Sequence, residues 1–427
     1  MPKSEPQRGA WIIVALLFLF MFINFADKVV LGLAGVPIMR ELNLSPKEFG
    51  LVASSFFLLF SASAVVTGFI VNRIETRWAL AVMGLIWALT QFPLLGSVGM
   101  MSLIACRIVL GAGEGPAYPV ALHAAYKWFP NEQRTLPTAV IAQGAAIGVI
   151  LVVPGLDWVI EHVSWHWAFG TLGFLGLGWV ALWLAFAREG SIPVTIADRS
   201  GRAVARVPYG ALLTCPTVWA AFASGFGAYW GLSLLVAWFT PFLVKGLGYS
   251  QYWASWITTL PWAMSVVIVL GVGWLSQAML AQGVSTRVAR GILGGGSVAL
   301  GGAALLAAPF APEAWMKVAL ITLGMSLPSV IYVMGHAIVS EFTPLPQRGA
   351  MLGINNAIAT LAGALAPISM GSVVQNAANA AEGYGNGFLI CGAVTLAGGL
   401  IGMAFLRPAD EIHRFAAAPR RRAVTAM

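Results

Sequence analysis

The sequence has 427 residues, of which 59% are hydrophobic and only 9% are charged, and its mean hydropathy is +0.83. This composition excludes a soluble domain and indicates an integral membrane protein. The formal net charge of +8 does not indicate a nucleic-acid partner, because most of the Lys and Arg residues fall in short loops and tails between apolar runs.

Apolar runs of roughly 20 residues recur along the whole chain, which is the length that a helix needs to cross a bilayer. We count twelve such runs, and they are too long for the strands of a membrane β-barrel. The first, from Trp11 to about Ile38, is too long for a secretory signal and is kept as span 1. The sequence therefore predicts an all-α membrane protein with twelve transmembrane helices in two six-helix bundles around a central cavity.

A polar, basic stretch from Arg188 to Val207 divides the spans six and six. The predicted organisation is an N-terminal bundle at 1–187, a cytoplasmic linker at 188–208, a C-terminal bundle at 209–406 and a basic tail at 407–427. Placing the amino terminus inside puts eighteen of the 24 Lys and Arg residues on the inner side, which predicts that both termini are cytoplasmic. We expect the tail to lie free or on the anionic lipid of a bacterial-type inner membrane.

Span 1 carries Asp27 and Lys28 deep in its apolar run. Adjacent residues of a helix point about 100° apart, so the two side chains do not share one direction. We expect one to face a cavity and the other a neighbouring helix; the alternative is that both reach back to an interface. A carboxylate that is removed from water holds a proton more readily, which makes Asp27 a candidate proton-coupling site.

Span 4 contains Arg107 and Glu114 inside an otherwise apolar segment. Their spacing is almost two helical turns, so both project from one face, about 10 Å apart along the axis. A charge at the bilayer centre costs at least about 2.5 kcal/mol, so we expect a water-filled pathway or a charged partner. Together with Asp27 and Lys28 these residues sum to zero charge. Inverted repeats would make spans 1 and 4 equivalent, both facing the central path, where protonation of the two acids would free the two cations.

Single polar or aromatic side chains interrupt other spans, and each has two interpretations. Gln143 either lines the cavity or bonds to a neighbouring helix, while Gly144 and Gly148 beside it predict close helix packing. The three cysteines lie in or at the edge of apolar spans, so we expect no metal, redox role or cofactor. In the second half, the expected cavity contacts, with packing or interhelical bonding as the alternative, are Tyr229, Trp230, His336, Asn355 and Asn356.

A short basic turn follows span 2 at 68–77. It resembles the Gly-x-x-x-Asp-Arg-x-Gly-x-Arg/Lys turn of the major facilitator superfamily, with Asn72 where Asp is usual and Glu75 where Gly is usual. Residues 287–290 repeat the turn in degenerate form, which indicates duplicated halves.

Within that superfamily the chain resembles the anion:cation symporters, which include sugar-acid permeases, sialin and the vesicular glutamate carriers. The resemblance covers nearly the whole chain and rests on residues 24–28, Arg107 with 114–116, 165–169, 273–290 and 353–367. It implies that Glu114 and Asp27 are proton-relay acids. It also implies that Arg107 is the charge partner that gates Glu114 and that Asn356 is a polar contact to the substrate.

Two departures from that family bear on the substrate. The family usually has arginine after the span 1 aspartate, whereas this chain has Lys28, a point charge without the bidentate fork of arginine. Relatives often have a tyrosine in span 2 where this chain has Phe60, which removes a hydroxyl and predicts a less hydroxylated substrate.

These observations predict a monomeric, proton-coupled symporter that imports a small organic anion, such as an aromatic or sugar acid, by alternating access. It is predicted to be a transporter and not an enzyme, with Lys28 and Arg107 among the substrate contacts. The alternative is a proton-driven antiporter that exports amphipathic or drug-like compounds, which two buried cations disfavour. An anion sensor or a lipid acyltransferase fits less well, because the sequence shows no signalling domain and no interfacial His/Asp motif.

Overall fold

The computed structural model describes residues 9–70, 74–129, 133–191, 207–412 and 414–415, and every regular element in these ranges is a helix. Eleven helical stretches in the described part are long and apolar enough to cross a membrane. Asn72 of the predicted basic turn and residues 192–206 of the predicted linker lie outside the described residues.

Close packing groups the chain into two compact units. Unit 1 comprises residues 1–195, 233–263 and 363–387, and unit 2 comprises residues 196–232, 264–362 and 388–427. The predicted division of the sequence into two six-helix bundles stays a prediction.

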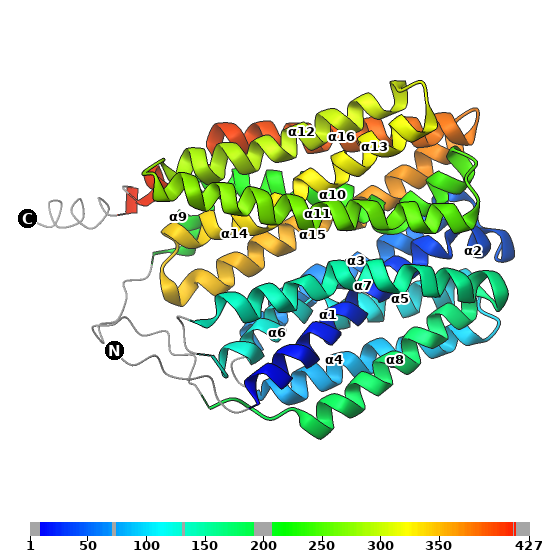
Figure 1. Ribbon diagram of the computed structural model, residues 1–427, viewed down its shortest axis with the longest axis horizontal. Coiled ribbons are helices and arrows are strands. Elements are labelled where there is room, and N and C mark those ends of the chain that lie inside the picture. Colours follow the sequence, from blue (N-terminus) through cyan, green and yellow to red (C-terminus); the bar gives the residue numbers. More distant parts are fainter. Residues whose placement is uncertain (1–8, 71–73, 130–132, 192–206, 413, 416–427) are drawn as a thin grey trace, which may run out of the picture. The chain divides into compact units, whose positions relative to one another are not determined.

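Unit 1 holds the helices of the first half of the chain together with parts of α10, α11, α15 and α16 (Figure 1). Its helices from the first half are α1 (Ala10–Leu33), α2 (Gly35–Glu41), α3 (Pro46–Ile70), α4 (Thr76–Gln91), η2 (Phe92–Leu95), α5 (Met100–Glu114), α6 (Ala117–Tyr126), α7 (Thr135–His162) and α8 (Trp165–Phe186).

The predicted fourth span is two helices rather than one, because α5 ends at Glu114 and α6 begins at Ala117. Pro116 lies between them, and a proline has no N–H to continue the hydrogen-bond ladder of a helix. Each piece is too short to count as a membrane span, which is why eleven long stretches are present where the sequence predicts twelve spans. The break places Glu114 in the last turn of α5.

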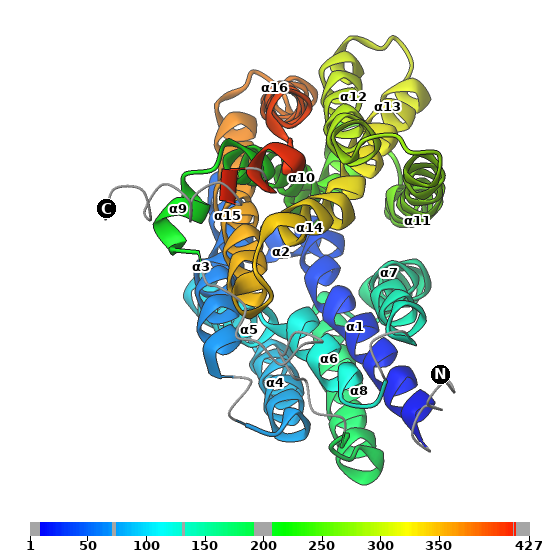
Figure 2. The same ribbon diagram turned by 90° about the vertical axis from the view of Figure 1, so that its left-hand side faces the viewer.

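Glycines allow the helices of unit 1 to approach each other closely. A Cβ atom at Gly144 or Gly148 of α7 would overlap the backbone of Phe18 or Phe22 of α1, which confirms the close packing predicted from their spacing. A Cβ atom at Gly111 of α5 would likewise overlap the Phe56 carbonyl of α3. Accordingly, α1 lies beside α7 and α3 beside α5 (Figure 2).

Segments from the second half of the chain complete unit 1. The Trp238 indole N–H donates to the Pro367 carbonyl at 2.9 Å, and the Ile368 N–H donates to the Ser54 hydroxyl of α3 at 3.1 Å. A Cβ at Gly50 would overlap the Pro367 carbonyl region, so α3 and α15 are in backbone contact. Parts of α10 and α15 are therefore packed directly on α3.

A second link of this kind involves Gln251 at the start of α11. Its amide donates to the Asp157 carboxylate of α7 at 3.0 Å and to the Leu33 carbonyl of α1 at 3.2 Å. Asp157 is buried, so this polar contact joins three helix ends inside unit 1.

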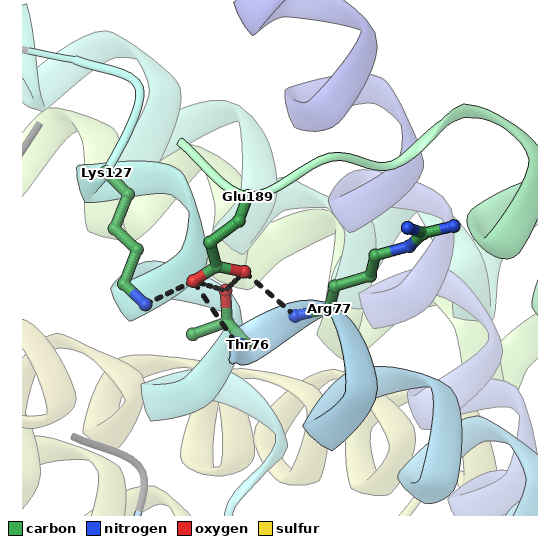
Figure 3. A network of polar contacts seen from close by, with 4 residues as sticks. All are labelled: Thr76, Arg77, Lys127 and Glu189. Carbon is green, nitrogen blue, oxygen red and sulfur yellow. Dashed lines mark hydrogen bonds and ion pairs between the residues drawn. The ribbon is translucent and has the colours of Figure 1, made fainter. Parts of the chain in front are cut away.

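Another polar network joins three helix ends of unit 1 around Glu189 (Figure 3). The Glu189 carboxylate accepts hydrogen bonds from the backbone N–H groups of Thr76 and Arg77, at 3.2 Å each, and forms an ion pair with Lys127. Burial alone would raise the pKa of Glu189, but the contacts from Lys127 and from the N-terminal amides of α4 lower it below its usual value. The ends of α4 and α6 are thus tied to the chain that follows α8.

Unit 2 contains the other parts of α10, α11, α15 and α16 and the helices between them. Its described elements are α9 (Tyr209–Leu213), η5 (Arg287–Ile292), α12 (Leu293–Ala307), η6 (Ala308–Phe310), α13 (Ala314–Ser326), η7 (Leu327–Ser329) and α14 (Val330–Phe342). It shares α10 (Pro216–Pro241), α11 (Gln251–Ala281), α15 (Leu345–Asn376) and α16 (Ala380–Phe405) with unit 1, and η4 (Phe242–Gly246) lies in unit 1.

Glycines again set the packing in unit 2. Gly295 and Gly302 of α12 meet the backbone of α16 so closely that a Cβ at either position would overlap it. The other side of α12 contacts α13, and the two helices run side by side in Figures 1 and 2. The glycine-rich sequence of α12 thus serves helix contact.

Candidate functional site

The ionisable residues of the first half of the chain meet in the interior of unit 1. Asp27 and Lys28 lie on α1, and Arg107 and Glu114 lie on α5. All four are buried, with exposed fractions of 1%, 6%, 2% and 1% respectively. The alternative in which the α1 pair reaches an interface is therefore wrong.

Lys28 and Glu114 form a direct ion pair. The Lys28 ammonium lies 2.6 Å from Glu114 Oε2, and the two side chains are 8% and 0% exposed. Lys28 also donates to the side-chain oxygen of Asn24, one helical turn earlier on α1. In the described conformation the ammonium is thus occupied by groups of the protein itself.

Asp27 points in a different direction from Lys28, as adjacent residues of a helix must. Its carboxylate accepts a hydrogen bond from the Gln91 amide at the end of α4, at 2.9 Å. Arg107 donates to the backbone carbonyl of Asp27 at 3.2 Å, while its Nε is buried without a hydrogen-bond partner. The two acids and two cations therefore form one electrically neutral cluster across α1, α4 and α5.

Phenylalanine rings surround the cations. The Lys28 ammonium lies 4.6 Å from the ring centroid of Phe25, 5.6 Å from Phe60 and 5.9 Å from Phe56. The Arg107 guanidinium lies 4.6 Å from the Phe56 ring. These distances are within the range of cation–π attraction, which is strongest where water is excluded. The rings therefore help to hold two cations in an otherwise apolar interior.

The remaining predicted site residue of unit 1 is not joined to this cluster. Gln143 lies half-buried on α7, and among the described residues no hydrogen bond connects it to the four ionisable side chains. Its role stays a prediction.

The predicted residues of the second half fall in unit 2. Tyr229 and Trp230 of α10 are each 9% exposed, and Tyr229 packs edge-on against Tyr332 of α14. His336 lies one turn after Tyr332 and contacts its backbone carbonyl through Nδ1. Tyr229 and Tyr332 thus form an aromatic pair, and the His336 ring contacts the backbone of Tyr332.

Two adjacent asparagines on α15 complete the predicted set. Asn355 is 5% exposed, and its side-chain oxygen has no hydrogen-bond partner among the described residues. Asn356 is half-buried. A buried amide oxygen without a partner is costly, so Asn355 is a candidate contact for a donor group.

Comparison with known proteins identifies the family. The profile of the Major Facilitator Superfamily matches residues 16–334, which is most of the chain. The chain belongs to the major facilitator superfamily. This membership places it among multi-pass membrane transporters rather than enzymes.

Individual members of the superfamily resemble it over almost their whole length. The D-galactonate transporter of Escherichia coli is 25% identical over 93% of this chain and 95% of its own. The hexuronate transporter of Bacillus subtilis is 27% identical over 93% of this chain and 94% of its own. A bacterial homologue of the human lysosomal transporter Spinster, solved in an inward-facing and unoccupied conformation, has the same fold. Its TM-score is 0.75 at 17% sequence identity, and the match covers 95% of this chain and 98% of that one. Such relatives agree with the resemblance to the anion:cation symporters of the superfamily.

Several residues that contact the charged cluster were not predicted as site residues. Gln91 is the only amide of its helix and lies in an apolar span, which is the signal that could have found it. Phe25 and Phe56 carry no such signal, because an aromatic residue in a membrane span usually packs against lipid or another helix. Only the structure shows that these rings lie at the charged residues.

Proposed function

We propose that the chain is a proton-coupled symporter that imports a small organic anion across a cell inner membrane by alternating access. It is a transporter of organic anions by family, and relatives are named for sugar acids such as D-galactonate. The distribution of Lys and Arg supports cytoplasmic termini. We further propose that it works as a monomer and needs no cofactor.

The buried Lys28–Glu114 ion pair is the observation that carries this proposal. A buried cation loses much of its stabilisation when its partner is neutralised. A proton on Glu114 removes the negative charge from the ion pair and makes the Lys28 ammonium available to another anion. A substrate carboxylate then takes the place of Glu114, so proton binding and substrate binding favour each other.

Asp27 and Arg107 keep the charge of the cluster balanced when a substrate carboxylate replaces Glu114 at Lys28. Asp27 lies beside Lys28 in sequence but bonds to Gln91, so it can take a second proton without breaking the Lys28 contact. Arg107 is held by the Asp27 carbonyl and the Phe56 ring, and it offsets the negative charge of both acids. Its fixed position favours the role of charge partner over direct contact with the substrate.

The other predicted residues stay proposed substrate contacts. Tyr229 and Trp230 offer aromatic surface, and His336, Asn355 and Asn356 offer polar groups. Gln143 is proposed as a weaker contact from α7.

The test is uptake by the full-length protein reconstituted in liposomes, with radiolabelled D-galactonate and benzoate as probes. Each proton that moves down a gradient of one pH unit supplies about 1.4 kcal/mol, which supports about tenfold accumulation. The wild-type protein should concentrate a transported probe when the outside is acidic. Glu114→Gln should lose this accumulation and keep exchange of labelled for unlabelled probe, because exchange needs no net proton movement.

The matched control is Glu161→Gln, which makes the same change at an exposed position of α7. It should accumulate the probe as the wild-type protein does. Continued proton-driven accumulation by Glu114→Gln would overturn the proposed coupling role.

A further inference from the structure

The surroundings of Lys28 bear on the kind of anion that can replace Glu114. On the α3 side, Phe56 and Phe60 present their rings to the ammonium, and on the α1 side Phe25 does so. Trp262 of α11 extends this surface, since its ring packs edge-on against Phe25 at 5.6 Å. Three aromatic rings therefore lie around the Lys28 ammonium, which is the proposed anion-binding group, and a fourth ring packs against one of the three.

Two serine hydroxyls on the same part of α3 are already used by the helix. Ser55 donates to the Val52 carbonyl at 2.7 Å, and Ser63 donates to the Phe60 carbonyl at 3.0 Å. A serine that donates to its own helix does not donate to a ligand at the same time. The α3 side of Lys28 thus offers a ligand mainly ring carbon.

The second cation of the cluster is less accessible than Lys28. Arg107 is 2% exposed, lies against the Phe56 ring and donates to the Asp27 backbone. A second carboxylate on the same ligand would have to displace these contacts. The cluster therefore provides one ammonium for one carboxylate.

We propose that the transported anion is a monocarboxylate joined to an aromatic or other apolar body, and not a polyhydroxylated sugar acid. The inference rests on the proposed function, in which Lys28 holds the substrate carboxylate. The atoms next to that carboxylate then lie among Phe25, Phe56 and Phe60. A sugar acid would bring hydroxyl groups to these rings, where they lose hydrogen bonds to water and find few replacements.

Binding to the purified full-length protein in lipid nanodiscs tests the inference, by isothermal titration at mildly acidic pH. The probes are benzoate, cyclohexanecarboxylate, phthalate as a dicarboxylate, and D-galactonate. We expect benzoate and cyclohexanecarboxylate to bind at least about tenfold more tightly than D-galactonate or phthalate, since a site without matching polar groups discriminates on this scale. Lys28→Gln should weaken the binding of every probe that the wild-type protein binds.

Phe60→Tyr restores a hydroxyl at the position nearest to Lys28 on α3. It should reduce the preference for benzoate over D-galactonate by about threefold or more, within the range expected for one polar group. Phe174→Tyr makes the same one-atom addition on the exposed face of α8 and should leave the preference unchanged. Thermal unfolding of both variants establishes that they are folded.

The outcomes separate the two proposals. Equal or tighter binding of D-galactonate that still depends on Lys28 would overturn the apolar-acid inference and leave the proposed function standing. An unchanged preference in Phe60→Tyr would also count against the role of the rings. If no anion binds in a Lys28-dependent way, the proposed function itself fails, and the inference fails with it.

Discussion

A double-mutant cycle on Lys28 and Glu114 would measure directly the interaction on which the proposed mechanism depends. The two charged atoms lie 2.6 Å apart, and the side chains are 8% and 0% exposed. Removing one partner of a buried ion pair typically destabilises a protein by about 3–5 kcal/mol, because the other charge is left without compensation. Here Arg107 and Asp27 remain nearby and offset part of the loss. We therefore expect about 2 kcal/mol for Lys28→Met and a similar value for Glu114→Gln, somewhat below that range.

The double variant should be far less destabilised than the sum of the single variants. Replacing both charges with neutral groups of similar size leaves no uncompensated charge, so we expect a cost of about 1 kcal/mol. The interaction energy is then about −3 kcal/mol, which is large for a pair of contacting residues. Reversible unfolding in mixed micelles, followed by tryptophan fluorescence at neutral pH, gives the four free energies. Additive effects of the two substitutions would refute the view that the ion pair is the stable state of the empty transporter.

Two further substitutions test the packing and the polar network of unit 1. Gly111→Ala would push a methyl group into the Phe56 carbonyl and should cost about 1–3 kcal/mol of unfolding free energy; Gly178→Ala, which meets no atom within 4 Å, should not be destabilising. Glu189→Gln should cost about 0.5–1 kcal/mol at pH 7, a modest value because the site is partly exposed. The pKa of Glu189 is lowered in the folded state, so this stabilisation is present above the unfolded pKa of about 4.3 and is lost as the pH falls through the folded value. The difference in unfolding free energy between Glu189→Gln and the wild-type protein should therefore vanish in acid. The control Glu161→Gln should show little difference at either pH. A pH-independent effect of Glu189→Gln would contradict the assigned contacts.

The class of fold follows from the sequence because long apolar runs in a bilayer have few alternatives to helices. Residue-level breaks are harder to predict. Pro116 was visible in the sequence, but a proline in a membrane helix produces either a kink or an end, depending on which neighbours satisfy the freed carbonyl groups. Contacts such as Trp238 with the Pro367 carbonyl depend on how distant segments pack, and periodicity carries no information about that.

The candidate site was predictable in its residue types but not in its pairings. Buried charges in apolar spans are rare enough to identify Asp27, Lys28, Arg107 and Glu114 from sequence alone. Which cation pairs with which acid depends on the rotation and relative height of α1 and α5. The structure pairs Glu114 with Lys28, whereas the family resemblance implied Arg107. The ring surroundings could not be predicted, because an aromatic residue near a charge has the same sequence signature as one that faces lipid.

The composition of unit 1 has a consequence for the order in which the protein can form during synthesis. The unit combines residues 1–195 with 233–263 and 363–387. The helices of the first half leave the ribosome long before the residues that cover part of their surface, including Pro367 against Gly50. Helices α1 to α8 are therefore in the membrane before these residues are made, with that surface covered by lipid or by other proteins. Unit 1 is complete only when the chain has been made as far as residue 387, so nascent chains halted before that point should remain sensitive to proteases.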